Sequence, residues 1–166
     1  SIAPSGTEKD GFDAKNITVN TNSKYEGYDI RTTLIRRTSD SDLDGGSGDD
    51  LDYTAESDMN LYQLSSKIDN SKGFTNFTFS RTEYDREYVN GTEIDTYDST
   101  SNTYILTNTL LKSNFDITPG IEYEYFDGSF NNTGSYTAKV DTDGENVGYF
   151  VNGNLIVSDK LLVSAG

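Results

Sequence analysis

Apolar and polar residues alternate with a period of two along most of this chain. In residues 115–125 the aromatic and aliphatic residues occupy odd positions, while acids and threonine occupy even positions. Successive side chains of a β-strand point to opposite faces, so this pattern predicts a strand with one apolar face and one wet face. Pro119 cannot donate a ladder hydrogen bond and predicts a bulge or local break there. The apolar side comprises Phe115, Ile117, Ile121, Tyr123 and Tyr125.

Seven further β-rich runs show the same alternation less cleanly, and no helical period of useful length appears. With residues 115–125 they predict an all-β fold, an antiparallel up-and-down meander of about eight strands that forms a barrel or partial barrel. We expect the whole chain, residues 1–166, to form a single β-barrel segment. The further predicted strands are residues 16–24, 28–37, 54–68, 74–89, 102–112, 146–157 and 160–166.

The predicted links between strands alternate between short and long. Such alternation is typical of an up-and-down barrel that has short turns at one rim and long loops at the other. The short turns are at residues 25–27, 69–73 and 112–114, with another tight reversal at 153–154 or at 158–159. The long polar links are residues 39–53, 90–101 and 128–146.

The composition excludes several functions. The formal charge of −15 would repel phosphate backbones, so we expect no nucleic-acid partner. Histidine and cysteine are both absent, which removes the usual general base and any thiolate, and we expect no enzyme. No apolar run reaches the length of a transmembrane helix, and residues 1–12 form a polar lead-in rather than a signal peptide. Strands of a membrane barrel need only about 9–11 alternating residues.

The link at residues 39–53 is the sharpest local feature, because acids stand at alternate positions before glycines. This arrangement resembles the first half of an EF-hand, and several carboxylates on a flexible chain suit calcium. The twelfth position counted from Asp40 is Leu51 rather than Glu, however, and no helices flank the loop. A solvated acidic loop is the alternative interpretation. The candidate calcium ligands are Asp40, Asp42, Asp44, Asp49, Asp50 and Asp52.

Charged residues elsewhere follow the same alternation. Glu83, Asp85 and Glu87 should share one face of a strand, and paired carboxylates of this kind would suit a glycosidase. Among 28 acids such pairs arise by chance, so this is the weakest functional hypothesis. The arginines are expected on wet faces, where they balance nearby acids; they are Arg36, Arg37, Arg81 and Arg86.

Tyrosine is abundant, with 12 residues in the chain. Tyrosines on strands can form belts at a membrane interface or can simply pack on a sheet. Both interpretations stay open. The tyrosines concerned are Tyr84, Tyr88, Tyr97, Tyr104, Tyr123, Tyr125 and Tyr149.

Several stretches, in this order along the chain, resemble the barrel of a bacterial TonB-dependent outer-membrane receptor. They comprise a polar turn into an early strand, a strand end with an acidic outer loop, a wall strand, a turn followed by a strand, and a final strand–turn–strand–turn series. The last of these, with turns at residues 152–154 and 158–159, is the most specific. The stretches are residues 8–12, 37–45, 77–88, 110–125 and 147–166.

This resemblance implies a part of a barrel wall, without the plug domain and the energy-coupling motif, in a parent protein of the bacterial outer membrane. The parent would bind and import a scarce small-molecule nutrient, such as a metal chelate or cobalamin, without catalysis. Within the family the nearest likeness is the cobalamin-transporter-like branch, in which outer-loop aspartates bind calcium, and Asp40 to Asp52 would match them. A chain excised in this way could form a homo-oligomer. The alternative is a soluble, extracellular calcium-binding β-module of a secreted or surface protein, similar to an adhesin.

Overall fold

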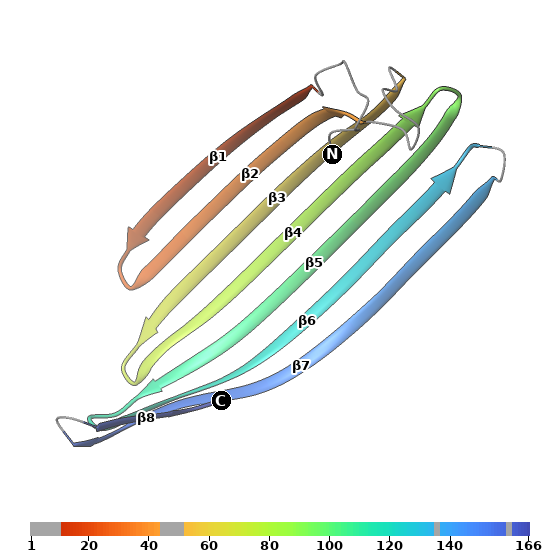
Figure 1. The fold of residues 1–166 in the computed structure, drawn as a ribbon. Helices are drawn as coiled ribbons and strands as arrows, with labels where there is room; N and C mark the ends of the chain where they lie inside the picture. The colour runs from red at the N-terminus through yellow and green to blue at the C-terminus, as the bar shows by residue number, and fades with distance from the viewer. Residues whose placement is uncertain (1–10, 44–51, 135–136, 159–160) are drawn as a thin grey trace.

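The computed structural model describes residues 11–43, 52–134, 137–158 and 161–166, and these form one antiparallel sheet (Figure 1). Each strand is hydrogen-bonded to the next one in the chain, so the predicted eight-strand meander is confirmed. Within the described ranges no helix is long and apolar enough to cross a membrane. The strands are β1 (Phe12–Tyr25), β2 (Tyr28–Asp42), β3 (Tyr53–Asn70), β4 (Gly73–Asn90), β5 (Glu93–Leu111), β6 (Phe115–Asn132), β7 (Ala138–Ser158) and β8 (Leu161–Ala165).

The sheet is a single open layer. β1 lies at one edge and β8 at the other, and the strand order does not close into a barrel (Figure 1). No second layer of described residues covers either face, and only Ala55 and Thr109 are buried among them. The partial barrel of the sequence prediction is therefore the form observed, with both faces of the sheet uncovered.

Two of the three long loops predicted from the sequence are wrong. β4 and β5 pair to their ends, Asn90 with Glu93, and the reversal between them contains Gly91, whose φ is +59°. β6 and β7 likewise pair to Asn132 and Ala138. Hydrophobic alternation stops in these regions because acids and threonines replace the apolar residues, but the backbone ladders continue. The strands are therefore longer than predicted. The third predicted long link, residues 39–53, is shortened too, because β2 extends to Asp42 and β3 begins at Tyr53, and residues 44–51 lie outside the described part of the chain.

The first three predicted short turns are confirmed. Glu26 and Gly27 form the first turn, with φ values of +41° and +86°, and the links at 71–72 and 112–114 are also short. Because both central residues of the first turn have positive φ, it matches the twist of a tight hairpin. The fourth reversal was predicted at 153–154 or at 158–159. Residues 152–154 lie inside β7, and the antiparallel pairing of Ser158 with Leu161 agrees with the second of these places.

Pro119 interrupts one ladder, as predicted. Between β5 and β6 the pairing stops at Thr107 with Gly120 and resumes at Leu110 with Ile117 in the same register. The Thr109 and Thr118 hydroxyls fill this gap with a 2.9 Å hydrogen bond. The break is thus local, since the register does not shift across it.

Candidate functional site

The sheet has two chemically different faces, which the pairing register defines. Residues directly opposite each other in a ladder point to the same side. Phe79, Tyr104 and Tyr123 are opposite one another across β4, β5 and β6, with ring centroids 5.0 and 6.1 Å apart. We call their side the banded face. The opposite side, which contains Ser65 and Thr78, is the polar face.

The banded face carries an uncharged and mostly apolar band over the half of the sheet next to the short turns. Its uncharged polar positions are Thr21, Ser23, Thr32, Ser66, Thr75 and Asn108. Its side chains are exposed, as in Ile17 at 62% and Tyr149 at 79%. Among the described residues, no Lys, Arg, Asp or Glu of the banded face lies inside the band. The band is built from residues 17–25, 28–34, 62–68, 73–79, 104–110, 115–125 and 147–155, on β1 to β7 in order.

The longest segment of the band matches the height of the apolar core of a bilayer. This segment, residues 115–125 of β6, has ten rises of about 3.3 Å and spans roughly 33 Å along the strand. A tilt of about 45° reduces this span to about 23 Å, close to the height of about 25 Å found on membrane barrels. The segments on the other strands are shorter, with seven or nine residues.

Tyrosines stand at or near the margins of the band, as in the aromatic girdles of membrane barrels. Four of the seven tyrosines considered in the sequence lie on this face, and Tyr84, Tyr88 and Tyr97 lie on the polar face. Tyr25 and Tyr28 mark the margin at the short turns. The margin toward the loops carries Tyr62, Tyr104, Tyr123, Tyr125 and Tyr149.

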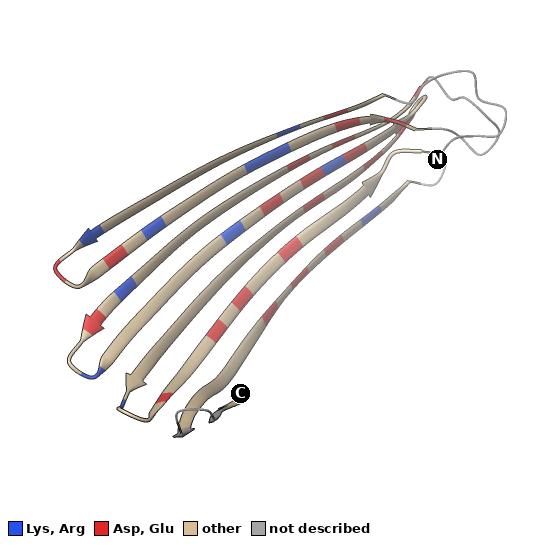
Figure 2. Ribbon diagram, turned by 60° about the vertical axis from the view of Figure 1, so that its left-hand side comes forward, with Lys and Arg blue, Asp and Glu red and all other residues tan. Residues whose placement is uncertain are grey.

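Acidic residues are frequent along the strands toward the loops (Figure 2). The pairing register places many of them on the banded face beyond the band. Exposed ion pairs offset a few of these charges, including Arg36 with Asp58 at 3.7 Å and Arg81 with Glu83 at 2.7 Å. Such pairs stabilise little, so the region is suited to water. The acids are Asp40, Asp42, Glu56, Asp58, Glu83, Asp85, Glu87, Asp98, Asp127, Asp141, Asp143 and Glu145.

Asp85 shows the electrostatic consequence of this crowding. It lies beyond the band, directly opposite Asp58 on one side and Asp98 on the other. Partial burial, followed by repulsion from Asp98, Glu83 and Asp58, raises the pKa of the Asp85 carboxyl. The predicted common face of Glu83, Asp85 and Glu87 is confirmed, since Tyr84 and Arg86 point the other way. The carboxylates repel one another, and nothing in the arrangement singles out a catalytic pair.

The six predicted calcium ligands are distributed between described and undescribed parts of the chain. Asp40 and Asp42 are in β2 on the banded face, and Asp52 immediately precedes β3. The Asp42 carboxylate accepts a 3.1 Å hydrogen bond from the backbone amide of Gly11. Within the described part of the chain no group of three or more acids is placed to hold a metal ion. Calcium stays a prediction, because the other three ligands, Asp44, Asp49 and Asp50, lie outside the described residues.

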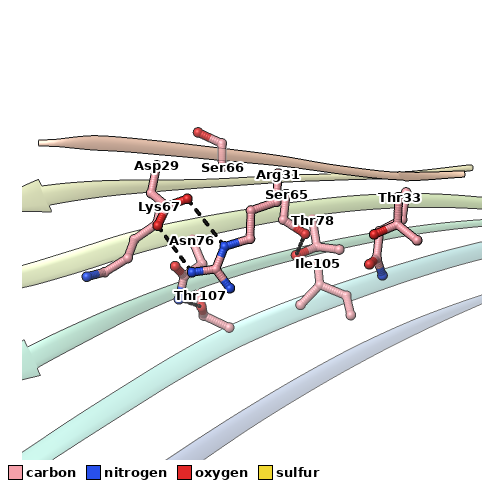
Figure 3. Close-up of a pocket in the computed structure, with 11 residues that line it drawn as sticks. Asp29, Arg31, Thr33, Ser65, Ser66, Lys67, Asn76, Thr78, Ile105 and Thr107 are labelled. Atoms are coloured by element: carbon pink, nitrogen blue, oxygen red, sulfur yellow. Dashed lines mark hydrogen bonds and ion pairs between the residues drawn. The ribbon is translucent and has the colours of Figure 1, made fainter. Parts of the chain in front are cut away.

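The polar face near the short turns contains a hydrophilic hollow of about 560 Å³ (Figure 3). The Arg31 guanidinium is held there by two hydrogen bonds to the Asp29 carboxylate, at 3.2 and 3.3 Å. Hydroxyl and amide side chains, with Lys67 and Ile105, line the rest. The Asn76 amide donates to the Thr107 hydroxyl at 3.5 Å. This surface suits water or polar groups, in contrast to the band behind it.

The polar face near the loops has a different character that sequence reasoning missed. Tyr88, Tyr97 and Phe130 stack across β4, β5 and β6, and the Arg86 guanidinium lies 4.4 Å from the Tyr88 ring centre. The alternation of Arg86 with acids was visible in the sequence. The meeting of Arg86 and Tyr88 with Tyr97 and Phe130 required the strand register to be known.

The predicted balancing of arginines by acids holds for only two of the four arginines considered. Arg36 and Arg81 pair with Asp58 and Glu83. No described carboxylate lies within ion-pair distance of Arg37 or Arg86. Both unbalanced arginines are on the polar face, whereas Arg36 and Arg81 are on the acidic part of the banded face.

Comparison with known proteins gives a likeness to a solved structure. No protein-family model and no curated protein matches the chain. Among solved structures, the chain is similar to the ferric yersiniabactin uptake receptor FyuA from Yersinia pestis, with a TM-score of 0.59 and 12% sequence identity. The match covers 91% of this chain but only 27% of that receptor. At this identity the likeness concerns the fold: the open meander has the form of a section of that receptor's structure.

Proposed function

We propose that this chain is a section of the β-barrel wall of a bacterial outer-membrane receptor of the TonB-dependent type, which takes up a small-molecule nutrient such as a metal chelate or cobalamin. The banded face would contact lipid and the polar face would line the interior. The chain would contribute to binding and passage of the nutrient, with no covalent chemistry. The similarity of the fold to an uptake receptor supports this proposal.

The observation that carries the proposal is the charge-free apolar band. A wet outer surface would intersperse charges along every strand, yet on the banded face charges begin only beyond the band. A charged residue on the lipid side of a barrel is costly near the bilayer centre and tolerated near its edges. Along the strands of this one face, the apolar residues lie toward the short turns and the acidic residues toward the loops. This distribution is the one expected where charges are excluded from the bilayer centre.

The alternative, a soluble calcium-binding module, has no structural feature in its favour. A soluble sheet must bury its apolar face against another layer. Here large apolar side chains of the band remain exposed in the described sheet, among them Ile17 at 62% and Val151 at 54%. In a membrane barrel, which is a single curved layer, lipid covers the apolar face.

The proposal is tested by refolding the full chain from urea in the presence of neutral phosphatidylcholine vesicles, followed by flotation in a density gradient. We expect the chain to float and to resist alkaline carbonate, which removes merely adsorbed protein. Neutral lipid excludes simple charge attraction for a chain of net charge −15.

A control without vesicles should give aggregation, because the exposed band has no cover in water. A well-folded monomer in lipid-free buffer that does not float would refute the proposal.

A further inference from the structure

We propose that the loop-side part of the polar face binds a planar aromatic acid through Arg86, Tyr88, Tyr97 and Phe130, which we call the ring cluster. The inference rests on the proposed function, because that function makes this face the interior wall that a nutrient would contact. It adds a class of ligand and the residues that recognise it.

The three rings of the cluster form a stacking surface across three strands. The Tyr97 and Phe130 ring centroids are 4.7 Å apart with a 34° interplanar angle, and Tyr88 meets Tyr97 edge-on at 6.1 Å. Tyr97 is 41% exposed, so its ring is accessible from the polar face. A hollow of about 280 Å³ adjoins Tyr97 and Phe130, and its other lining residues include Val140, Thr142 and Asp98. The register places the Asp98 side chain on the banded face. Such a surface favours a flat, partly apolar ligand over a fully hydrated one.

Arg86 supplies a positive charge without a carboxylate partner beside this surface. Its neighbours Asp85 and Glu87 point to the banded face. On the polar face, the Asp95 carboxylate accepts a hydrogen bond from the Asn132 amide. The Arg86 Nε is buried and has no hydrogen-bond partner among the described residues. Of the five arginines, Arg31, Arg36 and Arg81 pair with a described acid, whereas Arg37 and Arg86 do not.

Arg31 shows what a satisfied arginine looks like on the same face. It makes two hydrogen bonds to Asp29, so its charge is already neutralised. Arg86 instead lies over the Tyr88 ring, an arrangement that fixes the plane of the guanidinium and leaves donors for an incoming anion. A guanidinium recognises carboxylate oxygens through paired N–H donors. Together, the rings and this cation specify a flat aromatic ring that bears a carboxylate.

The test uses 2-naphthoate as the probe and the full chain refolded in vesicles. The chain contains no Trp, so the naphthoate fluorescence anisotropy can be followed against a low protein background. We expect saturable binding that the non-aromatic acid cyclohexanecarboxylate and the aromatic cation benzylamine do not displace.

Variants separate the ring cluster from general effects. Arg86→Gln and Tyr97→Leu should each weaken binding about tenfold, from the loss of the ion pair or of one stacked ring. Arg31→Gln removes a guanidinium from the same face but outside the cluster, and it should leave binding unchanged. Far-UV circular dichroism identifies any variant that has failed to fold.

The outcomes distinguish this inference from the proposed function. Insertion into vesicles without saturable 2-naphthoate binding would overturn the ring cluster as a site and leave the barrel-wall proposal intact. Equal weakening by Arg31→Gln and Arg86→Gln would also overturn it, because binding would then reflect net charge. Saturable binding to a chain that does not insert would support the cluster while refuting the membrane role.

Discussion

Replacing Leu64 by Arg is expected to reduce the stability of the membrane-inserted chain by about 2–4 kcal/mol, the cost of a charge on the lipid face near the bilayer midplane. Leu64 lies in the middle of the β3 part of the band and is 41% exposed. Its neighbours across the ladders are Thr32 and Phe79, so no carboxylate stands directly opposite to neutralise the new charge. Urea titration of the refolded chain in phosphatidylcholine vesicles measures the change.

Ser65→Arg is the matched control for this prediction. Ser65 is the next residue of the same strand, but it lies on the polar face and contacts the Thr78 hydroxyl at 3.4 Å. The added arginine would meet water rather than lipid there, so we expect a change below about 1 kcal/mol. Equal losses for the two variants would contradict the assignment of faces.

Replacing Gly73 by Ala is expected to cost about 3 kcal/mol and to open the end of the β4–β5 ladder. Gly73 has a φ of +152°, and an added Cβ would lie 1.9 Å from the backbone carbonyl oxygen of Thr109. Backbone cannot move aside as a flexible side chain can, and the φ value itself disfavours any L side chain. The same urea titration gives the loss, and amide hydrogen exchange at Leu110 and Leu111 should accelerate.

Gly91→Ala separates conformational strain from this clash. Gly91 also has a positive φ, +59°, but nothing lies within 4 Å of an added Cβ. We therefore expect a smaller loss of about 1 kcal/mol, which reflects the left-handed conformation alone. If Gly91→Ala cost as much as Gly73→Ala, the close approach of Thr109 would have no energetic role.

The apolar half of each strand could be predicted from the sequence, because there the hydrophobic period coincides with the strand period. The common face of Phe115, Ile117, Ile121, Tyr123 and Tyr125 and the hairpin turn at Gly27 were both predicted and observed. Both signals are local, since they depend on side-chain alternation and on residues that tolerate positive φ.

The loop-side half of the strands could not be predicted in this way. Asp95, Thr96 and Asp98 do not alternate regularly with apolar residues, yet they lie in β5 because this segment pairs with β4. A strand end rich in acids, threonine and serine has the composition of a loop, and only pairing with a neighbouring strand distinguishes the two.

The ring cluster was also beyond sequence reasoning, for a related reason. Arg86 stands between Asp85 and Glu87 in the sequence, and nearby acids were expected to balance its charge. The pleat of β4 places both acids on the other face. The register then places Tyr97 and Phe130, from two other strands, on the same face as Arg86. Predicting this neighbourhood requires the register of three strands, which alternation alone does not specify.

The most direct test of the central claim, that the banded face contacts lipid, is a lipid-quenching scan along β6. The chain has no cysteine, so single cysteines at positions 121, 122, 123 and 124 can each carry a bimane fluorophore. In vesicles that contain nitroxide groups on their acyl chains, positions 121 and 123 should be strongly quenched and positions 122 and 124 weakly quenched. Uniform quenching, or the reverse alternation, would contradict the claim.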